Sequence, residues 1–469
     1  MMTKFQLGVA VLVIASVQSL TAQTPLVPLP KSGTPPALSS GSSLLPPLPM
    51  PPRLGEGTAE EIKPPKEVTP GLPPIMPLAP PILGEVMPSC STCGTTNCTD
   101  PGCGGLEPKG PKDPVWISFT QLLLWFQPSR SPFPLATGLA GQTLLDGQSE
   151  LGMYKAFQVD GGMWLDKEHT FGVGMGLLIS EHRSAFQTVG SGPGGVTIRR
   201  PYTDAVTGAP TSVLVSNADG ANGVTPFAGS IATAVTARIA SADIGLRRNI
   251  LNTEHYRLNL LFGFRYFDLD ESLTVYQTSM PTTAIPAAGP RNVIPAGSTI
   301  QLLDRSYTRN QFYGGEVGGQ FEYHQGLFFV GVSPRLAFGP THQITQISGQ
   351  TQVTGPAPQT LQGGLLAAGE NGDGNLNRFV TNRFTVMTQV GAEVGVQITK
   401  HLRTSIGYQF IYLNDAARPG AQLSQTINPR VIPISSTYGS LSGPRAPNVT
   451  FDREGFYAHG AAIKLMLTY

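Results

Sequence analysis

The four cysteines of the chain stand close together, as Cys90, Cys93, Cys98 and Cys103, in the pattern C-x2-C-x4-C-x4-C. This spacing equals that of a zinc knuckle with cysteine in the histidine position, so a tetrahedral thiolate site for a metal ion is one alternative. An exported protein, however, meets an oxidising compartment in which two disulfides are the default. We predict disulfides, with a metal site and free or interchain thiols as the alternatives. The pairing cannot be derived, because four cysteines allow three connectivities.

Two further groups of residues could do chemistry. Glu181 and His182 could form an acid–base pair, but we interpret them as a solvated rim near the end of a strand. Asp373, Asn375 and Asn377 offer oxygen ligands, yet the segment lacks the glycine and terminal acid of a calcium loop and is predicted to be a surface loop. The chain contains no H-E-x-x-H, G-x-S-x-G or P-loop string. We therefore predict no catalytic residue, no cofactor, no metal ligand and no enzymatic activity.

Residues 1–22 have the features of an export signal peptide. Lys4 precedes an apolar run over residues 5–17, and small residues suited to cleavage lead up to Ala22. The run of about 13 residues is shorter than the roughly 18 that a spanning helix needs, and no later stretch reaches that length without charges, Gly or Pro. No cysteine follows the apolar core, so the usual lipid attachment point is missing. If the mature protein spans a membrane, we expect it to do so with strands.

Residues 23–89 form a proline-rich segment with almost no aromatic residue and no periodicity. Fixed proline torsions and missing donors favour an extended polyproline II linker over a folded core. We predict a disordered spacer, or alternatively a tether to the cell wall or to a periplasmic protein. Charged residues make up 13% of the chain and the formal net charge is +1, which provides no basic field for nucleic acid. No nucleic-acid partner is expected.

From residue 114 onward, large apolar side chains alternate with small or polar ones, which is the period of β-strands. Such stripes run from Phe171 to Leu177, from Tyr256 to Tyr266 and from Leu402 to Tyr412. Short polar links alternate with long links rich in Gly, Pro, Thr and Asn. The long links lie near residues 185–230, 276–305, 340–380 and 415–452. This alternation is typical of an outer-membrane barrel, so the predicted fold is all-β: a transmembrane antiparallel β-barrel with long extracellular loops.

We expect ten strands within residues 114–469, and twelve if 196–200 and 212–216 also form strands of the barrel. The ten are 115–126, 153–165, 170–183, 232–247, 255–275, 307–324, 327–339, 383–398, 402–413 and 455–469. An even number places both ends, and the linker, on the periplasmic side of a bacterial outer membrane. Aromatic residues near the strand ends, Trp116 and Trp125 among them, would face the lipid interfaces.

The C-terminal strand carries a signal of its own. Large residues recur at every second position up to the last one, Tyr469, among them Ile463, Leu465 and Leu467. This pattern resembles the terminal strand by which exported barrels are recognised for insertion. The barrel assembly machinery, through this strand, and the lipid of the outer membrane are therefore expected partners.

Several strings resemble a family of β-barrel porins of planctomycete-type bacteria. They are 116–118 with 122–125, the run 263–269 (GFRYFDL), 309–315 (RNQFYGG), 339–343 (GPTHQ) and 418–420 before Asn428 and Pro429. The resemblance covers about residues 114–469 and implies a barrel with a transport function, without a substrate or a catalytic residue. The first strand departs from the family pattern at Thr120 and Gln121.

If the bulky faces point outward, a nearly balanced set of charges points inward. The predicted lumen-lining residues are Asp160, Asp243, Arg257, Arg265, Glu316, Glu322, Arg335, Glu393 and Arg403. Ten strands leave at most a narrow pore, since about eight just hold packed side chains. Inward glycines either relieve crowding or leave open space. We expect a narrow pore for passive diffusion of small solutes; the alternative is a structural or adhesive barrel that displays long loops without conducting.

Overall fold

The computed structural model describes residues 114–469 except 149–150, 193, 219–224, 288, 370–372 and 441–442. The predicted signal peptide, the proline-rich segment and Cys90, Cys93, Cys98 and Cys103 lie outside the described residues, so these predictions stand as they are. The described part of the chain is built from β-strands, with one short 3-10 helix, η2 (Pro429–Val431). Within it, no helix is long and apolar enough to cross a membrane.

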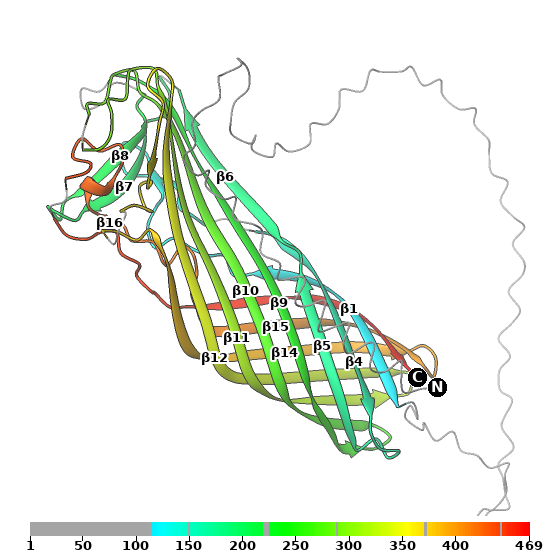
Figure 1. Ribbon diagram of the computed structural model, residues 1–469. Helices are drawn as coiled ribbons and strands as arrows, with labels where there is room; N and C mark the ends of the chain where they lie inside the picture. The colour runs from blue at the N-terminus through cyan, green and yellow to red at the C-terminus, as the bar shows by residue number, and fades with distance from the viewer. Residues whose placement is uncertain are drawn as a thin grey trace, which may run out of the picture. The chain divides into compact units, whose positions relative to one another are not determined.

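Ten antiparallel strands close into a ring, which confirms the predicted barrel and its strand number (Figure 1). Neighbours follow chain order, and the last strand pairs with the first over residues 116–126 and 458–468. A closed ring satisfies the backbone polar groups of every strand, which a membrane requires. The ten strands are β1 (Val115–Phe126), β4 (Met153–Trp164), β5 (Phe171–Ser180), β9 (Ala228–Asn252), β10 (Tyr256–Met280), β11 (Thr299–Gln325), β12 (Phe328–Thr354), β14 (Asn377–Gln397), β15 (Leu402–Ala416) and β17 (Glu454–Thr468).

Four short turns lie at one end of the ring, which we call the short-turn end; they join β4 to β5, β9 to β10, β11 to β12 and β14 to β15. Both ends of the barrel chain meet there, because the Val115 amide donates to the Tyr469 carbonyl and the Tyr469 amide donates to Val115. In the β4–β5 turn, the backbone amides of Phe171 and Thr170 donate to the Asp166 carboxylate. These bonds hold the pKa of Asp166 below its ordinary value.

Strands β9, β10, β11 and β12 are 25 to 27 residues long and continue far beyond the ring at its other end. Their extensions, together with β6 (Arg183–Ser191) and β13 (Gln359–Gln362) at the edges, form a curved sheet that we call the hood (Figure 1). The prediction of long loops at 276–305 and 340–380 is therefore wrong in large part. The extensions lie beyond the apolar belt, so they carry no continuous apolar stripe that would mark them as strands.

A second, five-stranded sheet packs within the long connections. It contains β2 (Ala136–Thr137), β3 (Thr143–Leu145), β7 (Ile198–Asp204), β8 (Pro210–Ser216) and β16 (Thr426–Ile427). The two extra strands considered near residues 196–200 and 212–216 exist as β7 and β8, but they pair with each other and do not enter the ring. Arg200 ties this sheet to the hood, since its guanidinium lies 2.7 Å from the Asp304 carboxylate and both side chains are buried.

The outer wall of the ring carries the large apolar side chains, as the alternation predicts. Phe262 is 49% exposed and Ile406 is 68% exposed, whereas the glycines and charges between such residues face inward. Tyr266 and Tyr313 stack at 5.2 Å between ring centroids on this wall near the hood. Trp116 is an exception to the expected aromatic belt, because it is 7% exposed and points into the ring.

The closed ring predicts heat-modifiable migration. Folded in detergent and left unheated, the protein should run ahead of its boiled form on a gel, because a closed barrel resists unfolding by dodecyl sulfate at room temperature. Circular dichroism should show a β-dominated spectrum for the unheated sample. A monodisperse, fully soluble monomer extracted in plain buffer would contradict the membrane assignment.

Candidate functional site: the interior of the barrel

The inward charges predicted from the sequence all lie inside the ring, and most are paired. In the first group, the Arg265 Nε lies 2.6 Å from Glu316 Oε2. Arg335 Nη1 lies 3.4 Å from Asp243 Oδ1 and 3.5 Å from Glu316 Oε1. Arg265 also lies 3.4 Å from Asp243 and donates to Gln389. Two cations and two carboxylates thus neutralise each other across β9, β10, β11 and β12.

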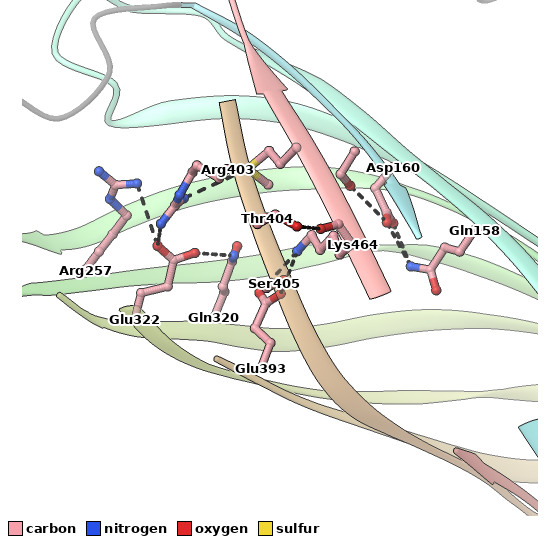
Figure 2. Close-up of polar contacts among 12 residues, drawn as sticks. Gln158, Asp160, Arg257, Gln320, Glu322, Glu393, Arg403, Thr404, Ser405 and Lys464 are labelled. Carbon is pink, nitrogen blue, oxygen red and sulfur yellow. Dashed lines mark hydrogen bonds and ion pairs between the residues drawn. The ribbon is translucent and has the colours of Figure 1, made fainter. Parts of the chain in front are cut away.

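A second group surrounds Glu322 nearer the short-turn end (Figure 2). Its Oε2 accepts from Arg403 Nη2 at 3.1 Å and lies 3.9 Å from Arg257 Nη1. His324 Nε2 lies 3.0 Å from the same oxygen. The Arg403 guanidinium also stacks on Phe329, 4.2 Å from the ring centroid. This group links β11 to β15 and narrows the interior at this end.

A third group joins Lys464 and Glu393, with Nζ 3.2 Å from Oε1, and the Ser405 hydroxyl donates to Glu393 at 2.6 Å (Figure 2). Asp160 belongs to none of the three groups. Its carboxylate accepts from the Gln158 amide at 3.0 and 2.9 Å and from the Ser118 hydroxyl at 3.4 Å.

The inward glycines are covered by neighbouring side chains. A Cβ built on Gly176 would lie 2.6 Å from Asp243 Oδ1 and 2.8 Å from Asp160 Oδ1. A Cβ on Gly174 would lie 3.0 Å from Arg247 Nε. The two interpretations left open by the sequence, relief of crowding and open space, are thereby separated at these positions. The glycines make room for the charged network, as tight packing over them shows.

A small polar cavity remains among these groups, with a volume of about 90 Å³. Its lining is rich in hydroxyl, amide and charged groups, including Thr120, Gln158, Arg247, Ser333 and Lys464. Thr120, one of the two residues at which β1 departs from the family pattern, therefore faces this cavity. At about 15 Å³ per probe-sized site, the space suits roughly six water molecules.

Above the cavity, toward the hood, a layer of side chains that sequence reasoning missed fills the cross-section of the ring; we call it the apolar layer. Each of the ten strands contributes at least one member, and all ten members named here are at most 4% exposed. A water-filled pore would leave its lining accessible, so the interior is closed at this level. The members are Leu124, Tyr154, Leu178, Ile239, Phe267, Phe312, Ala337, Met387, Leu413 and Phe456.

The contact between Phe267 and Phe456 shows how completely the layer fills the lumen. These residues lie on β10 and β17, which stand opposite each other in the ring of ten. Their ring centroids are nevertheless only 6.3 Å apart. Phe126 stacks on Tyr154 at 3.9 Å and meets Phe456 edge-on at 5.6 Å in the same layer. Aromatic contacts therefore run from wall to wall.

The segment after β15 folds inward and covers the apolar layer. Arg418, which is fully buried, donates from Nε and Nη2 to the Glu271 carboxylate at 2.6 and 2.9 Å. Its guanidinium also donates to the Gln127 carbonyl and lies 5.4 Å from the Phe456 ring centroid. The family-like string at 418–420 therefore anchors a loop over the mouth of the ring.

One signal in the sequence could have revealed the apolar layer. The inward positions of β1 are Trp116, Ser118 and Thr120 nearer the short-turn end, followed by Leu122, Leu124 and Phe126. The inward face thus changes from polar to apolar halfway along the strand. Alternation alone does not distinguish a polar lumen from a filled one, but this change within the inward set does.

The other candidate residues do not assemble into a site. Glu181 accepts from the Lys155 amide at 2.9 Å and lies 3.6 Å from Arg183, while His182 is exposed. Asn375 is buried and bonds to the backbone of Leu366 and Ala368, so it holds its loop together. Within the described ranges, no group of three His, Cys, Asp or Glu side chains could hold a metal ion.

Comparison with known families places this barrel. Residues 133–469 match the family described as Putative beta barrel porin-7 (BBP7), so the chain belongs to that family. This confirms the resemblance noted in the sequence, with β1 outside the matched residues. None of the curated proteins matches the chain.

Several solved structures are similar to the chain at low identity. The outer membrane protease OmpT from Escherichia coli is 12% identical, with a TM-score of 0.35, over 76% of this chain and 97% of that one. The toluene transporter TodX from P. putida is 8% identical, with a TM-score of 0.19, over 77% and 93%. A FadL homologue from Pseudomonas aeruginosa is 9% identical, with a TM-score of 0.18, over 76% and 89%.

Proposed function

We propose that the protein is an outer-membrane barrel that is closed at rest and displays the hood at the cell surface, without enzymatic activity. The observation that carries this proposal is the apolar layer, in which Phe267 and Phe456 meet from opposite walls. Ions do not cross a dry apolar layer, because a charge there loses its hydration without compensation. The proposal corresponds to the structural or adhesive alternative drawn from the sequence.

In the proposed orientation the short-turn end faces the periplasm and the hood faces the exterior, as in barrels with short periplasmic turns and long outer connections. The proline-rich linker would then be periplasmic and could reach the cell wall or a periplasmic protein. The outward ladder ending at Tyr469, in which Ile463 is 55% and Leu467 40% exposed, presents the strand that the assembly machinery would recognise.

Planar bilayers test the closed state. The purified full-length protein, whose insertion is verified by heat-modifiable migration, should give no stable openings across many insertions. Regular step-like openings of the wild type would show that the apolar layer is not fixed in the membrane. That result would favour the second candidate, the narrow pore for passive diffusion.

The second candidate is supported by the polar cavity and by the porin family to which the chain belongs. A pore would require the apolar layer and the loop held by Arg418 to move aside. The charged groups on the short-turn side of the layer would then control which ions pass, because rings of unpaired charge select counter-ions.

In any conducting form of the barrel, replacing Glu316 and Glu393 together by Gln should shift selectivity toward anions. Glu316 pairs with Arg265 and Arg335, and Glu393 pairs with Lys464, so the change frees three cations. The reversal potential in a salt gradient measures the shift. Glu168→Gln, in the β4–β5 turn outside the lumen, is the control and should leave the reversal potential unchanged. An unchanged potential in the double variant would contradict a path past these groups.

A further inference from the structure

Two charges that line the polar cavity have no partner of opposite charge. Among the described residues, no carboxylate lies within 4 Å of Arg247 and no cation lies within 4 Å of Asp160. The other charged residues of the lining are matched, since Lys464 pairs with Glu393, and Arg335 with Glu316 and Asp243. Charges taken out of bulk water are stable only when they are hydrated or paired. The cavity therefore presents one free cation and one free anion.

Both unmatched groups are held in place. The Arg247 guanidinium lies 3.9 Å from the centroid of the Trp116 ring, and its Nη1 donates to Gln320 Oε1 at 3.4 Å. Gly174 provides the floor for this stack, since a Cβ there would lie 3.0 Å from Arg247 Nε and 3.3 Å from the Trp116 ring. Two hydrogen bonds from the Gln158 amide fix the Asp160 carboxylate. The charges are thus kept apart and preorganised for a ligand.

The size and the neutral part of the lining limit what could bind. An apolar cavity of about 150 Å³ accommodates benzene, so a cavity of about 90 Å³ suits a ligand of roughly four to six non-hydrogen atoms. The hydroxyls of Thr120 and Ser333 line the cavity and form no hydrogen bond to another described residue. Several amides and hydroxyls are therefore at hand for a small polar molecule.

We propose that the cavity binds a small zwitterion, an α-amino acid of the size of glycine or alanine. Its carboxylate would lie on Arg247 and its ammonium group on Asp160. The apolar layer closes the side of the hood, so the ligand enters from the short-turn end. This site goes beyond the proposed function, because binding in the cavity does not require conduction through the barrel.

Calorimetric titration of the full-length, detergent-solubilised protein tests the site with glycine and with alanine. Arg247→Gln and Asp160→Asn should each weaken the affinity by about tenfold or more, since each removes one charge-assisted contact. Arg248→Gln is the matched control: this neighbour is exposed on the outer face of β9, 5.3 Å from the Phe171 ring, and its loss should leave the affinity unchanged. Acetate and methylamine, which carry one charge each, should bind about tenfold more weakly than glycine.

The absence of binding heat with both amino acids at millimolar concentration would overturn the proposal and leave a cavity filled by water. Acetate that binds as tightly as glycine would also overturn it, in favour of a simple anion site. Heat-modifiable migration of each variant shows that lost binding does not come from lost folding, and Asp160→Asn keeps the shape of the side chain. The bilayer recordings are independent of these titrations, so failure of one proposal is distinguishable from failure of the other.

Discussion

Replacing Phe267 and Phe456 together by serine is expected to convert a silent barrel into one that passes ions in planar bilayers. The two rings close the lumen between opposite walls, and both residues are fully buried. Serine removes most of their volume and adds hydroxyls that hold water, so a hydrated path could join the polar cavity to the mouth of the ring. The expected change is from no stable openings to regular, small ones.

The matched control replaces the chain neighbours, Tyr266→Ser with Tyr457→Ser. These side chains lie on the same two strands but point outward, so the apolar layer stays intact and the barrel should remain silent. Heat-modifiable migration must be retained in both double variants, because loss of core rings costs about 3–5 kcal/mol each. A folded Phe267→Ser, Phe456→Ser barrel without openings would show that the other members of the layer seal the lumen without these two.

Phe262→Arg is expected to lower the free energy of unfolding in lipid by about 2–4 kcal/mol, the cost of a cation at the midplane of a lipid-facing wall. Phe262 is 49% exposed on the outer face of β10, within the apolar belt. Urea titration of the protein folded into vesicles, followed by tryptophan fluorescence, measures the loss. Unchanged stability would show that this face does not contact lipid.

Tyr276→Arg provides the control for that experiment. Tyr276 lies on the same strand and the same face but in the hood, and it is 40% exposed there. Arginine at this position meets water, so the free energy of unfolding should change by less than about 1 kcal/mol. Gly263 is not a suitable comparison, although the sequence points to it as an inward site. A Cβ there would lie 2.3 Å from the Ile244 carbonyl oxygen, because β9 and β10 approach closely at two glycines.

The sequence by itself determines the wall of this barrel. A strand places alternate side chains on opposite faces, so stripes such as the one from Tyr256 to Tyr266 predict which residues face lipid from local order alone. The inward direction of Arg265, Glu316 and Arg403 follows from the same rule. The close of the chain on Tyr469 and the four short turns likewise predict the even strand number and the position of both ends, since these depend on neighbours in sequence.

Only the tertiary structure decides what the wall encloses. Which inward residues share a level depends on the register of ten pairings and on the tilt of the strands, and neither is encoded in the period of a single strand. Phe267 and Phe456 lie far apart in the chain and meet only because closure brings β10 opposite β17. The same closure pairs Glu322 with Arg403 and leaves Asp160 and Arg247 without partners. Side chains that look alike in the alternation therefore form a charged network at one level and a sealed apolar layer at the next.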